Sequence, residues 1–204
     1  MAERLAGEGP TGGRVFEALA SVPRHLLVPE ALRSDAYRDV ALPIGDGQTI
    51  SAPGVVAAMT AALELQGHET VLEIGTGSGY QAAILSRLAA RVVSIECIPR
   101  LAARARSALD RLGVTNVVVY LGDGSVGRRA DAPFDAIVVT AGGPEVPQPL
   151  LEQLAPGGRL VGPFGSRKEQ RLLRVRRTKG GRTQSELIGR CRFVDLVGSH
   201  GWAR

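Results

Sequence analysis

The chain has 204 residues, a formal net charge of +5 and 44% hydrophobic residues, which suits one globular domain with a full core. It contains no run of about 18 apolar residues, so the sequence predicts no membrane span and no membrane partner. Cys97 and Cys191 are too few for a zinc cage or a disulfide framework, so we expect no metal-binding residues and a cytoplasmic location.

The N-terminal part is predicted to be a flexible tail followed by short helices. Residues 1–13 are small and polar and lack the apolar core of a signal peptide. Residues 14–21 have helical spacing, and Pro23 ends that helix. We interpret His25, beside Pro23, as a turn residue rather than a ligand. Because neither a linker nor an internal repeat follows, residues 14–204 are predicted to form a single domain.

Residues 43–53 are predicted to form a loop because they are rich in glycine, proline and polar residues. The segment is too polar to be core, yet too apolar at Ile44 and Ile50 to be simply solvated. An amphipathic helix is expected over residues 54–65, and Ser51 lies where its cap belongs. Ser51 is therefore either an N-cap or a functional hydroxyl, and the two roles are compatible.

Residues 70–80 read as a buried strand that runs into a glycine turn, and residues 81–90 as the helix after it. The turn has three alternate glycines: Gly75, Gly77 and Gly79. Such a turn begins a βαβ unit and lets a ligand approach bare backbone, although it can also simply link a strand to a helix. The dinucleotide fingerprint needs its third glycine where Tyr80 stands, which argues against a NAD enzyme.

Two acidic residues identify the ligand class more closely. Glu73 lies inside the apolar strand, which is costly unless the carboxylate meets a partner. Glu96 follows the next apolar run, 91–95, and is placed to bind two ribose hydroxyls. The combination resembles the S-adenosylmethionine-dependent methyltransferases of the Rossmann-like class. That resemblance implies an α/β fold with a doubly wound, mostly parallel sheet, in which Glu73 faces the methionine amino group directly or through water.

The third strand, residues 116–121, follows a helix over residues 99–112 and leads into a Gly-Asp-Gly turn. Ligands of doubly wound sheets bind outside the carboxyl ends of the strands. Asp123 in this turn is therefore placed to accept a hydrogen bond from an adenine amino group. A plain Asp-Gly turn is the alternative.

The last third is predicted to complete the sheet and to end in an antiparallel hairpin. The expected elements are strand 134–140, helix 149–154, strand 159–163, hairpin strands 170–177 and 182–188, and a last strand, 192–197. Methyltransferases that act on base amines carry an Asn/Asp-Pro-Pro-aromatic loop after the fourth strand. Here Thr140 is followed by Ala-Gly-Gly, which argues against a nucleic-acid partner.

Much of the positive charge lies between residues 167 and 192. A basic run of this kind can bind nucleic acid, but Phe193 is the only aromatic residue close to it. We favour a solvated face on late strands. As a further hypothesis, the run favours acidic peptides.

Short strings across residues 14–198 occur in the same order in the protein-L-isoaspartate (D-aspartate) O-methyltransferases. They are Val22-Pro23-Arg24-His25, Leu42-Pro43-Ile44-Gly45, Gly47-Gln48-Thr49-Ile50-Ser51 with Pro53, residues 71–80, Gly122-Asp123-Gly124, residues 133–137, Pro156-Gly157-Gly158 and Arg192-Phe193-Val194. The string from Gly47 to Pro53 is specific to that family, whereas the glycine turn is shared with many methyltransferases.

The resemblance implies methyl transfer from S-adenosyl-L-methionine to the free carboxylate of L-isoaspartyl and D-aspartyl residues in damaged proteins. Ser51 matches the active-site serine, and Thr140 the strand end near the methyl group. The other matched cofactor-binding residues are Gln48, Thr49, Ile50, Glu73, Gly75, Gly77, Glu96, Asp123 and Gly124. We expect a monomer, because no apolar helix stripe is left without a partner.

The expected reaction needs no general base, which agrees with a site that has no evident His or Cys dyad. An isoaspartyl carboxylate resembles an α-carboxyl group, with a pKa of about 3.5, so it needs no general base at neutral pH. Two positions depart from the family pattern: Gly54 stands where His or another large residue is frequent, and Asp195 where Pro is usual. The alternatives are a methyltransferase for a small molecule or RNA, and a module that binds the cofactor without catalysis.

Overall fold

The main sheet of this computed structural model, which describes residues 12–203, has seven strands in the order β5-β4-β3-β6-β7-β8-β9. The strands are β3 (Thr70–Ile74), β4 (Arg91–Glu96), β5 (Val117–Leu121), β6 (Phe134–Val139), β7 (Leu154–Gly165), β8 (Gln170–Arg177) and β9 (Thr183–Cys191). The first five strands in spatial order pair in parallel, and β8 and β9 add antiparallel pairs. The order reverses between β3 and β6, and ligands bind at such a switch point.

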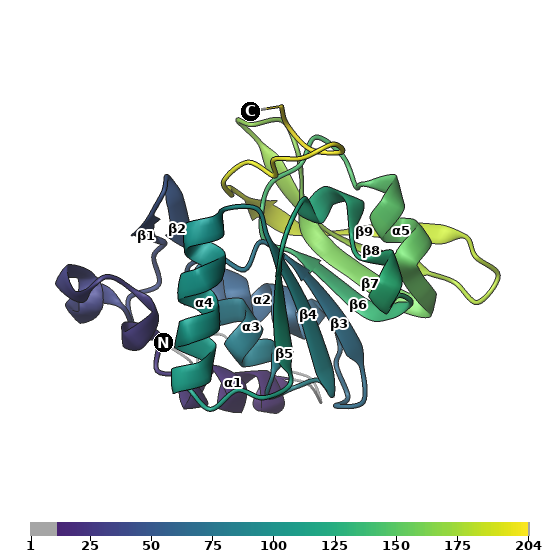
Figure 1. Ribbon diagram of the computed structural model, residues 1–204. Coiled ribbons are helices and arrows are strands. Elements are labelled where there is room, and N and C mark those ends of the chain that lie inside the picture. Colours follow the sequence, from purple (N-terminus) through teal and green to yellow (C-terminus); the bar gives the residue numbers. More distant parts are fainter. Residues whose placement is uncertain (1–11, 204) are drawn as a thin grey trace.

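Helices cover both faces of the sheet (Figure 1). They are α1 (Gly12–Ser21), α2 (Pro53–Ala62), α3 (Tyr80–Leu85), α4 (Pro99–Arg111) and α5 (Gln148–Gln153), with short 3₁₀ helices at Arg24–Leu27, Glu30–Asp35, Gly124–Val126 and Arg129–Asp131. Buried residues form two apolar clusters, one with α1 to α4 and one with α5. Val71 belongs to the first cluster and Leu72 to the second, because neighbouring strand residues point to opposite faces. This explains why β3 is apolar at successive positions. The predicted doubly wound, mostly parallel α/β fold with its C-terminal hairpin is confirmed.

The prediction of a loop over residues 43–53 is wrong. Strands β1 (Leu42–Gly45) and β2 (Gln48–Ile50) form a separate antiparallel hairpin there. Asp46 and Gly47 form its tip with positive φ values of 53° and 71°, as Asp-Gly hairpin turns require. The two strands have only four and three residues, so the glycine, proline and polar content of the segment favoured a loop over the hairpin that its Asp-Gly turn indicates.

Several element boundaries also differ from the predicted ones. Residues 1–11 of the predicted tail lie outside the described residues, and α1 begins at Gly12, two residues before the predicted start. α3 ends at Leu85 and continues as turns, and α2 spans Pro53–Ala62 rather than residues 54–65. No strand forms over residues 192–197, which make only isolated bridges such as that between Asp195 and Gly142.

Candidate active site

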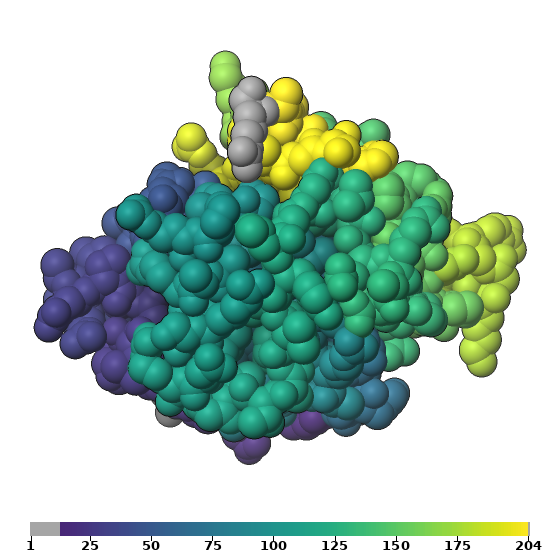
Figure 2. Space-filling view, viewed as in Figure 1, coloured from purple at the N-terminus to yellow at the C-terminus, as the bar shows by residue number. Residues whose placement is uncertain are grey.

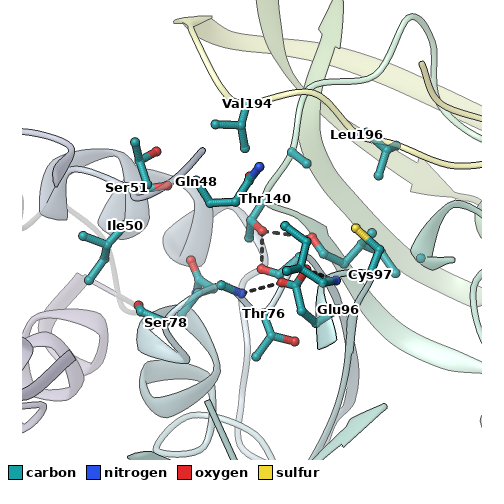
Figure 3. Close-up of a pocket in the computed structure, with 18 of the residues that line it drawn as sticks. Gln48, Ile50, Ser51, Thr76, Ser78, Glu96, Cys97, Thr140, Val194 and Leu196 are labelled. Atoms are coloured by element: carbon teal, nitrogen blue, oxygen red, sulfur yellow. Dashed lines mark hydrogen bonds between the residues drawn. The ribbon is translucent and has the colours of Figure 1, made fainter. Parts of the chain in front are cut away.

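A cavity of about 480 Å³ lies at the carboxyl ends of β3, β4 and β6 (Figure 3). Its volume is within the usual range for sites that bind small molecules. All the predicted site residues except Glu73 and Asp123 line it: Gln48, Thr49, Ile50, Ser51, Gly75, Gly77, Glu96, Gly124 and Thr140. The structure therefore brings the β1–β2 hairpin, the glycine turn and three strand ends to one space.

The glycine turn after β3 needs its glycines for two reasons. Gly75 and Gly77 have φ values of 97° and 54°, which side chains rarely adopt. A Cβ on Gly75 would also lie 2.5 Å from Thr140 Oγ1. That hydroxyl lies 2.6 Å from the carbonyl oxygen of Gly75 and 2.9 Å from that of Ile74, and donates into this pair. Thr140 thus ties the end of β6 to the turn that lines the cavity.

Glu96, at the end of β4, is held by backbone groups on two sides. The Gly77 N–H donates to Oε2 at 2.8 Å, and the Ile98 N–H donates to Oε1 at 3.0 Å. The side chain is nearly buried but lines the cavity. Each carboxylate oxygen has a second lone pair, so Glu96 remains able to accept hydrogen bonds from a ligand.

The structure does not place Glu73 in the cavity. Its side chain is fully buried and accepts a hydrogen bond from Ser94 Oγ, which in turn lies 2.5 Å from Thr76 Oγ1. The contact of Glu73 with a ligand, directly or through water, stays a prediction: Glu73 is not among the residues that line the cavity, and its link to the cavity runs through the Ser94 and Thr76 hydroxyls. Burial raises the pKa of Glu73 from 4.5 to about 8, aided by the charge of Glu96 and opposed by the Ser94 hydrogen bond.

We expect the buried Glu73 to make stability depend on pH. Its folded-state pKa is raised, so between about pH 4.5 and 8 the folded state holds a proton that the unfolded state releases. The free energy of unfolding should then fall as pH rises through this window, by up to about 1.4 kcal/mol per pH unit from this group. Urea denaturation at pH 5.5 to 8 measures the effect. Glu73→Gln, which cannot ionise, should flatten the profile, and parallel profiles for the two proteins would contradict the assignment.

Asp123 lies beside the main cavity rather than in its wall. It lines a smaller cavity of about 350 Å³ together with Cys97 and Val197, both of which also line the main cavity. Its Oδ1 accepts from the backbone N–H and the hydroxyl of Ser125, and its Oδ2 accepts from Ser199 N–H. The side chain thus caps the turn that follows β5, as the plain-turn alternative requires, and its pKa is lowered by the hydrogen bonds that it accepts against the opposing effect of burial.

Ser51 is held between β2 and α2. Ile50 on one side is buried in the core, and Pro53 on the other is the first residue of α2. Ser51 is not the N-cap of α2, because that position belongs to Ala52, which makes no side-chain cap. Among residues 12–203 no hydrogen bond involves the Ser51 hydroxyl, so it is available to a ligand in the cavity.

Two residues that the sequence analysis did not assign to the site hold this region in place. Asp39 Oδ1 accepts from the Gly54 N–H at 2.7 Å and so caps α2 from a distance. A Cβ at position 54 would lie 2.8 Å from Asp39 Oδ2, which accounts for the absent side chain at Gly54. Arg24 is fully buried, donates to Ala36 O at 2.7 Å and lies over the Tyr80 ring. It fixes the segment that carries Asp39 against the start of α3.

The C-terminal segment of residues 194–197 forms the remaining wall of the cavity, opposite the glycine turn (Figure 3). The Gly142 N–H donates to Val194 O at 2.7 Å, and the Leu196 N–H donates to Gly142 O at 2.9 Å. The buried Gln170 side chain binds both backbone groups of Phe193, at 3.1 and 2.7 Å. A lone Gln at a strand start gives no sequence signal for this role.

The negative charge of the unusual Asp195 is paired with a cation. Its Oδ2 accepts from Arg167 Nε at 2.7 Å, and the Arg167 guanidinium lies 4.7 Å from the centre of the Trp202 ring. Within residues 12–203, no group of three or more His, Cys, Asp or Glu residues is arranged to hold a metal ion. No helix in that part of the chain is long and apolar enough to cross a membrane.

Comparison with known proteins identifies close relatives of the chain. A family model described as protein-L-isoaspartate(D-aspartate) O-methyltransferase matches residues 2–201. Protein-L-isoaspartate O-methyltransferase 1 of Syntrophobacter fumaroxidans is 57% identical over 199 residues, which cover 98% of this chain and 92% of that protein. The protein-L-isoaspartate O-methyltransferase of Methanoculleus marisnigri is 54% identical over 199 residues, with coverage of 98% and 90%.

Solved structures agree with the sequence relatives. A protein-L-isoaspartate O-methyltransferase matches with a TM-score of 0.85 and 29% identity, covering 98% of this chain and 67% of that one. A putative enzyme of the same name from Plasmodium falciparum, in complex with S-adenosyl-L-homocysteine, matches with a TM-score of 0.80 over 96% of this chain and 94% of that one. Its 22% identity supports the shared fold alone.

Proposed function

The chain belongs to the protein-L-isoaspartate(D-aspartate) O-methyltransferase family, and on that premise we propose which of its residues carry the reaction. It is a protein repair methyltransferase that uses S-adenosyl-L-methionine to methylate the free carboxylate of L-isoaspartyl and D-aspartyl residues in damaged proteins. The observation that supports the site best is that the Ser51 hairpin and the Glu96 strand end line one cavity.

The residues of the cavity fit the cofactor. Glu96 offers a fixed carboxylate for two ribose hydroxyls, and the bare backbone of Gly75 and Gly77 leaves room for the methionine part. When bound, S-adenosyl-L-methionine supplies a methyl group: a carboxylate oxygen forms a C–O bond, the C–S bond breaks, and its electron pair stays on sulfur. Gln48, Thr49, Ile50 and Thr140 enclose the methyl end in this proposal.

Ser51 is the proposed catalytic residue. The attacking carboxylate is already ionised at neutral pH, because its pKa is about 3.5, so no group of the chain has to remove a proton. The chain must instead hold the carboxylate oxygen in line with the methyl carbon. The Ser51 hydroxyl, which makes no hydrogen bond within residues 12–203, donates one hydrogen bond that orients the carboxylate.

The adenine end is proposed to lie toward Gly124 and Asp123. A Cβ on Gly124 would lie 2.5 Å from Ile74 Cγ2, so glycine lets the turn after β5 approach β3 closely. Asp123 lines the smaller cavity, which shares Cys97 and Val197 with the main one, and this places its carboxylate on the side proposed for the adenine amino group. Glu73 is proposed to act on the methionine end only through the Ser94 and Thr76 hydroxyls and water, since Thr76 lines the cavity.

We further propose a cytoplasmic monomer with no nucleic-acid or membrane partner. Exposed large apolar side chains of the described residues come from several separate elements, including Leu26, Val118 and Leu187. Only two cysteines occur in the chain, as is usual in a reducing compartment. Sedimentation velocity tests the monomer, and a dimer at micromolar concentration would contradict it.

One assay tests the function and its alternatives together. The full chain is incubated with tritiated S-adenosyl-L-methionine and either an isoaspartyl peptide or the same peptide with normal aspartate. We expect base-labile methyl ester on the isoaspartyl peptide alone. Equal label on both peptides would show a different acceptor preference, and label on neither would favour another acceptor or a module that only binds the cofactor.

A further inference from the structure

Two groups of cations can be distinguished within the basic stretch of residues 167–192, apart from those at the β8–β9 hairpin tip and Arg190. In the group far from the cavity, Arg174 and Arg176 both pair with Glu64, at 2.8 and 2.5 Å, and Arg174 also pairs with Glu186. Arg177 Nη1 donates to Leu154 O at 2.5 Å, at the start of β7. These cations are therefore used within the fold.

The second group, here called the basic rim, consists of Arg167, Lys168, Arg171 and Arg192. It lies where the turn between β7 and β8 meets the end of β9. Two contacts place it beside the cavity. Arg167 pairs with Asp195, which lines the cavity, and Gln170 binds the backbone of Phe193 next to cavity-lining Val194.

The basic rim carries uncompensated charge. The segments 166–171 and 190–195 contain five cations, the rim residues and Arg190, against two carboxylates, Glu169 and Asp195, an excess of three. Asp195 pairs with Arg167 and Glu169 with Arg190. No ion pair joins Lys168, Arg171 or Arg192 to a carboxylate among residues 12–203, and all three are exposed.

We propose that the basic rim is a docking surface for acidic residues that flank the isoaspartyl residue in the substrate. The inference rests on the proposed use of the cavity for a peptide carboxylate, and it specifies which substrates are preferred. Ser51 and residues 194–197 line the same cavity, so a peptide whose carboxylate reaches Ser51 lies close to the wall that adjoins the rim. Acidic flanking residues on the side of the rim are then attracted by its exposed cations, an attraction that salt screens over about 8–10 Å at moderate ionic strength.

The Arg167–Asp195 ion pair keeps the basic rim attractive to an anionic substrate. Unpaired, Asp195 would place a negative charge in the cavity wall next to the rim, where it would repel an anionic substrate. The pairing with Arg167, supported by the Trp202 ring, neutralises that charge and leaves the net potential of the rim positive.

The test compares isoaspartyl peptides that differ only in their flanks. Three peptides with two acidic, two neutral or two basic flanking residues are assayed with the full chain at about 20 mM and 500 mM salt. We expect kcat/KM for the acidic peptide to exceed that for the basic peptide by about tenfold at low salt, mostly through KM. The ratio should approach one at high salt, since exposed charges are screened.

Matched double variants locate the effect. Lys168→Glu with Arg192→Glu reverses two exposed charges of the rim, whereas Lys179→Glu with Arg182→Glu makes the same change in net charge at the hairpin tip. Figure 2 shows this tip projecting at the right, away from the C-terminal residues at the top. We expect the rim variant to lose or invert the preference and the tip variant to keep it within about twofold.

The outcomes separate this inference from the proposed function. If the neutral peptide is methylated but the three peptides have equal kcat/KM, or if rim and tip variants behave alike, the docking surface is disproved while the function stands. If no isoaspartyl peptide is methylated, the proposed function fails and the docking surface with it.

Discussion

Replacing Ser51 with alanine is expected to lower kcat for an isoaspartyl peptide about a hundredfold, while the affinity for S-adenosyl-L-methionine stays within about twofold. Loss of one aligned hydrogen-bond donor in an active site costs about 10²–10³ in rate. The hydroxyl is not used within the described fold, and Ser51 is not the cap of α2, so its removal should leave the hairpin and helix in place. Stopped assays for kcat and titration calorimetry for cofactor affinity separate the two effects.

The serine variants have internal controls. Ser51→Thr keeps a hydroxyl and should recover part of the lost turnover, with a higher KM from the added methyl group. Thermal unfolding of each variant without ligand shows whether the fold is intact. Full turnover by Ser51→Ala with normal cofactor affinity would remove Ser51 from the mechanism.

Glu96→Gln is expected to weaken binding of S-adenosyl-L-methionine about a hundredfold or more. The Glu96 carboxylate accepts from the Gly77 and Ile98 N–H groups on opposite oxygens. A glutamine has only one carbonyl oxygen, so its NH₂ group would face one of those donors. The variant also loses a charge-assisted acceptor for the ribose, worth about 1.5–3 kcal/mol per hydrogen bond.

The measurement for Glu96→Gln is calorimetric titration with S-adenosyl-L-homocysteine, supported by KM for the methyl donor. At saturating donor, kcat should change less than the affinity, because the ribose does not react. An exposed isosteric change far from the cavity, Glu152→Gln, serves as the control for handling and concentration. An unchanged dissociation constant for Glu96→Gln would mean that the ribose binds elsewhere.

The parts of the fold around the cavity that were predicted correctly from the sequence depend on local rules. The apolar run of β3, the glycines that need positive φ and the acid at the end of β4 all follow from residue type and spacing along one βαβ unit. The family strings added Ser51 and its neighbours, and the structure places those residues in the cavity wall. Local patterns of this kind can be recognised from residue type and spacing alone.

The tertiary structure decided what depends on segments distant in the chain. The buried Arg24, the cap from Asp39 to Gly54, and the bond between Gln170 and Phe193 each join residues at least 12 positions apart, so no local pattern predicts them. Glu73 does not line the cavity and is linked to it through the Ser94 and Thr76 hydroxyls, an arrangement that depends on the pairing of β3 with β4. The basic stretch likewise reads as one run in sequence, yet the pairing of β7, β8 and β9 puts part of it against Glu64 and part beside the cavity. The sequence by itself determined most of the helices and strands. The packing of those elements decided which partners the buried polar and charged groups have, because such groups are stable only where distant segments supply hydrogen bonds or opposite charges.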